Sequence, residues 1–321
     1  MRRLVVAFVF AMSVFAEHAV AQSFPERTIT LINPYAAGGP ADLLARTVAD
    51  GMSETLGRPV VVENRPGAGT AIGARAVAQA NPDGHTLFLG GSPSHVITPA
   101  LMKDANYDGI KDFTPITTVA NVPNMLVVPP GRPYKSVKDL VDAAKDANGR
   151  MTFASIGVGS IPQFLGVLFQ LRAGVTLVDV PYKGAAPASV DLLGGRVDMA
   201  FLNVPAVLPQ VQSGQLRGLA VADAKRAKAL PDTPTMAEAG YPSVAMSTWY
   251  GISAPAKTPR EVIGRLYAAI AQTLNSPKAK EKIEAQGAEI FVKNPDDYAA
   301  YLQADAKLML ELIKAAHMTA N

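Results

Sequence analysis

Residues Ile29–Asp42 read ITLINPYAAGGPAD, and this stretch combines a strand, a glycine-rich loop and the start of a helix. The run Thr28–Ile32 is short and apolar, as is typical of a buried strand. Pro40–Leu56 carries leucine, valine and methionine at helical spacing and is followed by Gly57, a residue type that commonly terminates helices. Because strand, loop and helix in this order form the repeating unit of α/β folds, the stretch predicts that class.

A second stretch, in the middle of the chain, has the same order. Thr152–Ser155 predicts a strand, Ile156–Ile161 a loop with two glycines, and Pro162–Ala173 a helix. Small residues let the backbone approach a ligand closely, and the unpaired N–H groups at a helix start favour a carboxylate. Gly67–Thr70 precedes a further expected helix and would add a third group of donors. We therefore expect an anion site, with tight turns that bind nothing as the alternative.

Asp42 lies in the expected first turn of the helix that follows the first loop. A carboxylate there would repel an anionic ligand, whereas it can accept hydrogen bonds from the N–H groups at the helix start. We therefore expect a structural role for Asp42.

Short apolar runs and helical patterns alternate through the rest of the chain, which predicts βαβ units and largely parallel sheets. The last quarter is expected to be more helical, with starts at Thr258–Glu261 as a capping box, Ser276–Pro277 and Asn294–Asp297. Further strands are expected at Val60–Glu63, Thr86–Leu89, Met125–Val128, Val175–Val180, Val197–Leu202 and Leu216–Ala222.

The composition is that of a folded chain rather than a disordered one. The chain has 321 residues, 49% hydrophobic and 18% charged, enough for about two ordinary domains. It has no cysteine, which excludes disulfides, Cys-ligated metals, thiol nucleophiles and a lipid anchor on cysteine. The net charge is +3, and the sequence contains no run of basic residues of the kind that indicates nucleic-acid binding.

The N-terminal segment, residues 1–21, has the pattern of a secretory signal peptide. Met1–Arg3 is cationic, Leu4–Ala16 is almost wholly apolar, and Ala19–Ala21 has small residues at the positions that a signal peptidase reads. The apolar segment is shorter than the roughly 18 residues of a spanning helix. We expect cleavage near Ala21 and a periplasmic protein, with a retained membrane anchor as the alternative.

The sequence lacks the usual motifs of metal, hydrolytic and nucleotide chemistry. No histidine belongs to an HExxH motif or to an i, i+4 pair with a second ligand, so no metal site is expected. Gly90–Ser94 lacks the last glycine of GxSxG, and Pro93 removes an N–H that an oxyanion hole would use. Gly67–Gly73 is one residue off a dinucleotide motif, and no Walker lysine follows a glycine loop. We expect no catalytic residue and no cofactor.

Motifs spread over the mature chain form one ordered set. They are Pro34–Asp42 with Arg46, Val61–Gly69, Pro82–Leu87, Asp112–Ile116, Val180–Gly184, Leu193–Asp198, Leu230–Thr235, Glu238–Gly240 and Trp249–Gly251. In these motifs the chain resembles the Bug-type substrate-binding proteins of tripartite tricarboxylate transporters. The resemblance implies an α/β type II periplasmic-binding-protein fold, in which two α/β lobes close on a ligand.

The resemblance also implies a division of the chain and a set of ligand contacts. Lobe 1 is expected at 23–122 plus 231–321, and lobe 2 at 123–230. Family members grip one carboxylate with the two glycine loops, partly through ordered waters. The residues carried over for this grip are Tyr35, Ala36, Ala37, Gly38, Gly69, Thr70, Gly157, Gly159 and Ser160. Those expected near the far end of the ligand are Ser92, Ser94, Gly184, Ala185 and Asn203.

The sequence departs from the family pattern at a few positions. Gln163 and Val167 stand where family members often have histidine and glutamate. Tyr35 replaces a common phenylalanine, and Ala41 replaces a common threonine. These changes bear on the identity of the ligand rather than on the fold.

Together these features predict a monomeric periplasmic receptor for a small organic carboxylate. It would deliver the ligand to integral-membrane transporter subunits and perform no bond chemistry. One alternative is a ligand sensor that docks on a receptor kinase. Another is a periplasmic hydrolase using Ser92 or Ser160, against which the absence of a His–carboxylate motif argues.

Overall fold

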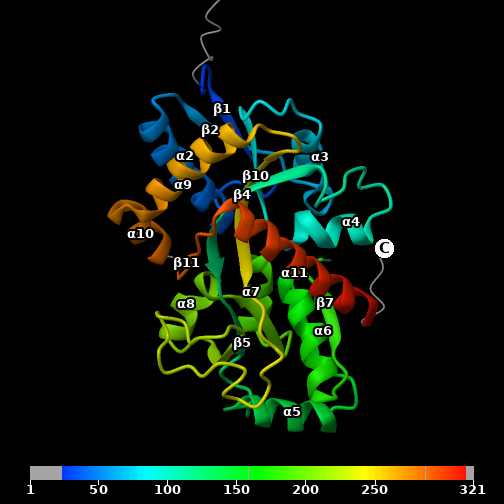
Figure 1. The fold of residues 1–321 in the computed structure, drawn as a ribbon. Coiled ribbons are helices and arrows are strands. Elements are labelled where there is room, and N and C mark those ends of the chain that lie inside the picture. The colour runs from blue at the N-terminus through cyan, green and yellow to red at the C-terminus, as the bar shows by residue number, and fades with distance from the viewer. Residues whose placement is uncertain (1–23, 158, 286, 316–321) are drawn as a thin grey trace, which may run out of the picture.

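The computed structural model describes residues 24–157, 159–285 and 287–315, and the predicted signal peptide lies outside them. Two β-sheets, each flanked by helices, lie one above the other in Figure 1. The upper sheet has the strand order β11-β4-β10-β3-β1-β2, and the lower sheet has the order β7-β6-β8-β5-β9. The predicted α/β class is confirmed. Within the described residues, no helix combines the length and apolarity needed to cross a bilayer.

The upper sheet combines a parallel and an antiparallel part, because β1 pairs in parallel with β2 and β3, whereas β10 pairs antiparallel with β3 and β4. Its strands are β1 (Ile29–Asn33), β2 (Val60–Asn64), β3 (Thr86–Gly90), β4 (Phe113–Val122), β10 (Thr248–Pro255) and β11 (Glu289–Ile290). Its helices are α2 (Pro40–Leu56), α3 (Ala71–Ala78), α9 (Arg260–Asn275) and α10 (Pro277–Glu284), with short turns η1 (Ala68–Thr70), η2 (Pro93–Ile97) and α4 (Thr98–Leu101).

The lower sheet is built from the middle of the chain. Its strands are β5 (Asn124–Val128), β6 (Thr152–Ser155), β7 (Val178–Pro181), β8 (Met199–Asn203) and β9 (Arg217–Val221). The helices around it are α5 (Val137–Asp146), α6 (Ile161–Ala173), α7 (Ala185–Leu193) and α8 (Val204–Gln212). Here β6 pairs in parallel with β7 and β8, as βαβ units require, whereas β5 pairs antiparallel with β8 and β9. Both sheets are therefore mixed, and the expectation of largely parallel sheets is wrong, because β5 and β10 each enter their sheet in the reverse direction.

The chain passes between the sheets at two neighbouring places. Only Pro123 separates β4 of the upper sheet from β5 of the lower sheet. The return runs through residues 222–247 between β9 and β10. The two passages touch, because Asn124 Nδ2 donates to the carbonyl of Met246 at 3.0 Å.

The C-terminal helix α11 (Pro295–Ala315) runs across the middle of the molecule in Figure 1. Its buried residues Leu302 and Met309 belong to the same apolar cluster as Phe153 of β6 and Phe164 of α6. The same cluster also includes Val96 of η2 and Trp249 of β10, and the main contacts of α11 are with β4 and η2. The last helix therefore lies where the cores of the two sheets meet.

Most predicted elements agree with the structure to within a few residues. The predicted bounds of α2 are confirmed, and Ser276 caps α10 by accepting the N–H of Ala279. The capping box at Thr258–Glu261 is wrong, because the Thr258 hydroxyl donates to the carbonyl of Pro255 and the helix begins after Pro259.

Candidate ligand-binding cleft

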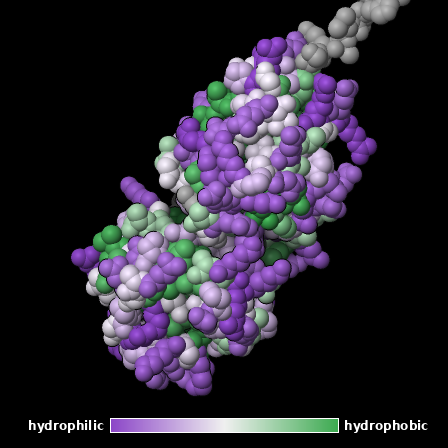
Figure 2. Space-filling view, turned by 90° about the vertical axis from the view of Figure 1, so that its left-hand side faces the viewer, coloured by the Kyte–Doolittle hydropathy of each residue, from purple (hydrophilic) through white to green (hydrophobic). Residues whose placement is uncertain are grey.

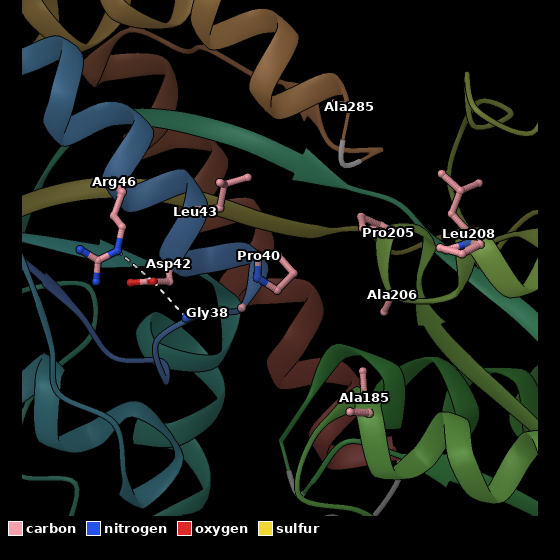
Figure 3. A pocket seen from close by; sticks show the side chains of 13 residues that line it. Gly38, Pro40, Asp42, Leu43, Arg46, Ala185, Pro205, Ala206, Leu208 and Ala285 are labelled. Atoms are coloured by element: carbon pink, nitrogen blue, oxygen red, sulfur yellow. Dashed lines mark hydrogen bonds and ion pairs between the residues drawn. The ribbon is translucent and has the colours of Figure 1, made fainter.

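A cleft of about 750 Å³ opens between the two sheets. The start of α2 forms one wall, the starts of α7 and α8 form the other, and the end of α10 lies at the margin (Figure 3). Figure 2 shows the molecule narrowing to a waist between its two halves. The lining residues are Gly38, Gly39, Pro40, Asp42, Leu43, Arg46, Ala185, Ala186, Pro205, Ala206, Leu208, Pro209 and Ala285.

Three of the helices at this cleft begin without a side-chain cap. Their N-cap residues are Gly39 for α2, Gly184 for α7 and Asn203 for α8. The N–H groups in the first turn of a helix have no partner within the helix and carry partial positive charge. Pro40 and Pro205 have no N–H, and the N–H of Val204 donates to the carbonyl of Pro123 at 2.9 Å, so only part of the first turn of α2 and of α8 can donate to a ligand. Because the first residues of all three helices line one cleft, the remaining donors make that cleft suited to an anionic group.

The first glycine loop, Tyr35–Gly38, joins β1 to α2 and exposes its two alanines and Gly38 to solvent. The N–H of Gly38 donates to Oδ2 of Asp42 at 3.0 Å. The Tyr35 ring packs edge-on against Tyr250, with 5.9 Å between the ring centroids. Burial, followed by the nearby Tyr250 and Tyr107, raises the pKa of Tyr35, so its hydroxyl stays protonated and is able to donate.

Asp42 has the structural role expected from its first-turn position. Besides the N–H of Gly38, its carboxylate accepts Arg46 Nε at 3.0 Å and Asn64 Nδ2 at 2.9 Å. Burial opposes ionisation, but these hydrogen bonds lower the pKa of Asp42 to about 2. The ionised carboxylate therefore ties the loop to α2 and β2 at neutral pH.

The second glycine loop lies between β6 and α6, and the hydrogen bonds at its described residues come from Ser160 and from Gln163 of α6. Ser160 is the N-cap of α6, and its hydroxyl donates to the carbonyl of Gly157 at 2.7 Å. The Oε1 of Gln163 accepts the N–H of Gly159 at 2.8 Å. A Cβ added at Gly159 would lie 3.1 Å from Cγ2 of Ile97, so glycine permits close approach between this loop and η2.

Gly69 and Thr70 belong to a left-handed turn directly before α3. Positive φ angles of 127°, 45°, 58° and 86° follow one another through Gly67–Thr70. The carbonyl of Gly69 accepts the hydroxyl of Thr98, which fastens the turn to the start of α4. This pair is therefore fixed in place but does not belong to the cleft lining.

Ser92 and Ser94 are buried, and their hydroxyls are engaged inside the fold. Ser92 Oγ donates to Oδ2 of Asp305 on α11 at 2.7 Å. Ser94 Oγ accepts the N–H of Gly91 at 3.0 Å. Burial raises the pKa of Asp305 despite the hydrogen bond from Ser92.

Three of the residues expected near the far end of the ligand, Gly184, Ala185 and Asn203, lie at the starts of α7 and α8. Gly184 has a φ of +116° directly before α7, and Ala185 lines the cleft. Asn203 Nδ2 donates to Asn124 Oδ1 and to Thr248 Oγ1, both at 3.0 Å. Asn203 therefore connects the start of α8 to the two passages between the sheets.

The structure brings some of the sequence-predicted residues together and leaves others apart. Gly38 and Ala185 line the same cleft from opposite walls, whereas the remaining predicted residues lie outside its lining. Whether the set contacts a ligand stays a prediction. Sequence reasoning missed the lining residues Leu43 and Pro205, although a proline at an expected helix start marks such a position. It also missed Asp305, because no local pattern links it to Ser92.

The geometry at the two candidate serines does not provide a hydrolytic pair. Ser92 and Ser160 donate to Asp305 and to the carbonyl of Gly157, and His95 Nδ1 lies 2.7 Å from the carbonyl oxygen of Gly109. In the part of the chain that the structure describes, no group of three or more His, Asp or Glu side chains could hold a metal ion.

Comparison with known proteins gives one consistent result. Residues 44–318 match the family described as "Tripartite tricarboxylate transporter family receptor". The chain is 38% identical over 299 residues to Protein BugT of Bordetella pertussis, covering 93% of this chain and 92% of that protein.

Solved structures agree with the sequence match. The periplasmic binding protein BugD has a TM-score of 0.81 at 35% identity, covering 93% of this chain and 100% of that one. R. palustris Rpa4515 with adipate has a TM-score of 0.84 at 35% identity, covering 92% and 99%. These likenesses confirm the periplasmic-binding-protein fold with two lobes. The chain therefore belongs to the tripartite tricarboxylate transporter receptor family, as a Bug-type periplasmic solute-binding protein.

Proposed function

We propose that this protein captures a small organic carboxylate in the cleft and delivers it to a tripartite tricarboxylate-type membrane transporter, without bond chemistry. The observation that carries the proposal is the convergence of three helix starts without side-chain caps on one cleft. Their N–H groups would make charge-assisted hydrogen bonds to a carboxylate. The adipate named with the R. palustris relative supports a carboxylate ligand for this chain.

The two sheets would belong to two lobes that close on the ligand. In this proposal lobe 1 comprises residues 23–122 and 231–321, and lobe 2 comprises residues 123–230. The two segments that connect the sheets, Pro123 and residues 222–247, lie side by side. This arrangement supports a hinge between the lobes at these two segments. A ligand that contacts both lobes shifts the population toward the closed arrangement.

The proposed site uses the residues expected from the sequence, but with different roles for those expected at the far end of the ligand. The carboxylate would be held from Tyr35–Gly38, Gly69–Thr70 and the loop 157–160. Gly184, Ala185 and Asn203, expected at the far end, lie at the starts of α7 and α8 and would help to hold the carboxylate instead. Ser92 and Ser94 would act by holding the segment after β3, since their hydroxyls are already engaged.

We further propose that the protein works as a monomer in the periplasm, after cleavage near Ala21. The periplasmic setting is that of its family. Its partner would be the integral-membrane subunits of the transporter.

The proposal is tested by calorimetric titration of protein that has been unfolded, freed of bound ligand and refolded. The panel comprises mono-, di- and tricarboxylates, amino acids and aromatic acids. We expect saturable binding of at least one carboxylate at micromolar concentration or below. Refolded protein that binds no member of this panel would overturn the proposal.

A substitution at the start of α2 tests the anion site directly. Gly39 has a φ of −86° and little around its Cα, so Gly39→Asp is tolerated and caps α2 with its own carboxylate. We expect at least a tenfold loss of carboxylate affinity with an unchanged or raised melting temperature. Gly131→Asp, at another open position outside the cleft lining, is the matched control. Equal affinities of the two variants would exclude the start of α2 as the anion site.

A further inference from the structure

The chemistry of the cleft walls restricts what the ligand can carry besides its carboxylate. Asp42 and Arg46 are the charged residues among those that line the cleft, and the other lining residues are glycine, alanine, proline and leucine. The two charged side chains pair with each other at 3.0 Å. Arg46 also donates to Asn64 Oδ1 at 3.3 Å. The guanidinium charge is therefore compensated within the lobe that carries it.

The directions of the side chains that line the cleft also limit which chemical groups the ligand can carry besides its carboxylate. In Figure 3, Asp42 and Arg46 point away from the opposite wall, whereas Pro40 and Leu43 lie on the side of α2 that faces it. The opposite wall presents Pro205, Ala206 and Leu208. The space between the walls is thus bounded by apolar groups on both sides, and only the helix starts offer polar N–H groups.

We infer that the ligand is a monocarboxylate whose remaining part is apolar and uncharged, an aliphatic or aromatic acid rather than a di- or tricarboxylate; this rests on the proposed function. A second carboxylate placed between Leu43 and Leu208 would lose water without gaining a side-chain donor there, because Arg46 is paired with Asp42 and directed away, and such a loss is strongly unfavourable. Methylene or ring groups in the same place release water from apolar surface on both sides. A cleft of about 750 Å³ leaves room for a body larger than that of acetate.

The decisive experiment compares two acids with the same six-carbon chain. Hexanoate ends in a methyl group where adipate has a second carboxylate. Calorimetry on refolded, ligand-free protein should show hexanoate binding at least tenfold more tightly than adipate. Octanoate, benzoate and phenylacetate separate an aliphatic from an aromatic preference. Adipate binding as tightly as the best monocarboxylate would overturn the inference and leave the proposed function intact, whereas a panel without any binder would overturn the proposed function.

Variants in the apolar wall give a second, independent readout. Leu43 is half-buried, so Leu43→Gln keeps the helix while replacing apolar by polar surface. We expect about a fivefold loss of hexanoate affinity and no loss for adipate. Leu310→Gln on α11, at a side chain that is 50% exposed, is the matched control and should leave both affinities unchanged. Unchanged hexanoate affinity in Leu43→Gln would contradict an apolar ligand body at this wall.

A cation placed on the opposite wall should reverse the preference. Ala206 lies across the cleft from Leu43 and is partly exposed, so Ala206→Arg is compatible with folding. We expect adipate to gain at least fivefold in affinity relative to hexanoate, because the new guanidinium would pair with the second carboxylate. A melting temperature close to that of the unmodified protein would show that the variant is folded. An unaltered preference in the folded variant would count against the assigned position of the ligand body.

Discussion

Nε2 of Gln163 donates a hydrogen bond of 2.7 Å to Oδ2 of Asp179, while Oε1 of the same side chain accepts the N–H of Gly159 at 2.8 Å. Gln163 is the third residue of α6, and Asp179 lies on β7, the parallel neighbour of β6. One amide side chain therefore ties the second glycine loop, its helix and the adjacent strand together.

The upper sheet contains the same arrangement with the two side-chain types exchanged. Asp42 is the third residue of α2, and its carboxylate accepts the N–H of Gly38 and Nδ2 of Asn64 on β2. Here the acid lies on the helix and the amide on the strand, whereas Gln163 and Asp179 have the reverse order. Both loops are thus held by a first-turn side chain, which a ligand carboxylate would have to displace in order to bind the N–H of Gly38 or Gly159.

Replacing the amide at Gln163 by an acid should make stability depend on pH. Gln163→Glu brings a second carboxylate against Asp179, and like charges at this distance raise the pKa of one of them. We expect a loss of about 1–2 kcal/mol in unfolding free energy at pH 7, with recovery as the pH falls to about 5. Urea denaturation at both pH values measures the unfolding free energy of the variant and of the unmodified protein. Gln303→Glu, exposed on α11, is the control, and similar pH profiles for the two variants would contradict the Gln163–Asp179 contact.

The carboxylate of Asp42 should stabilise the fold at neutral pH and lose this effect in acid. Its pKa is lowered from 3.8 to about 2, so its stabilisation is fully present above about pH 4 and is lost as the pH falls through about 2. Asp42→Asn should therefore be less stable than the unmodified protein by about 2 kcal/mol at pH 7, with a smaller difference near pH 2.5. Chemical denaturation across this range measures the difference. Asp50→Asn, exposed on the same helix, should show no such trend.

The buried carboxyl of Asp305 should have the opposite pH dependence. Its pKa is raised by burial, so it binds its proton more tightly in the folded state, and its contribution to stability falls as the pH rises above about 4. Asp305→Asn keeps an acceptor for Ser92 without the charge. The unfolding free energy of this variant, relative to the unmodified protein, should increase between pH 4 and pH 8. Asp296→Asn, at a side chain that is 88% exposed on the same helix, controls for net charge, and a flat difference for Asp305→Asn would refute the prediction.

Two glycine-to-alanine changes in helices should have opposite effects. A Cβ at Gly166 of α6 would overlap the ring of Phe153, so Gly166→Ala should destabilise the protein by about 1–3 kcal/mol. Gly264 of α9 has open space around it, so Gly264→Ala should stabilise it by about 0.5–1 kcal/mol. Urea denaturation of the two variants side by side measures both. Stabilisation by Gly166→Ala would show that α6 packs differently on β6.

Local sequence patterns predict the helices and several strands because the interactions behind them span only a few residues. The bounds of α2 and the cap at Ser276 follow from apolar spacing and cap chemistry within one or two turns. Thr258 has the same kind of local signal, yet its hydroxyl bonds to Pro255 instead. Local patterns do not predict the strand β4. Its position is set by pairing with β10, which aligns Val122 with Thr248, a residue far away in the sequence.

The sequence by itself determined the α/β class, the two strand–glycine loop–helix units and the family, since each depends on residue types at short or ordered spacing. Only the tertiary structure decided which of these parts meet. The meeting of three helix starts at one cleft depends on how the two sheets are placed. The hydrogen bond from Ser92 to Asp305 joins residues 213 positions apart in the sequence. Such contacts arise from the packing of α11 and the sheets into a shared core, which no short-range pattern encodes.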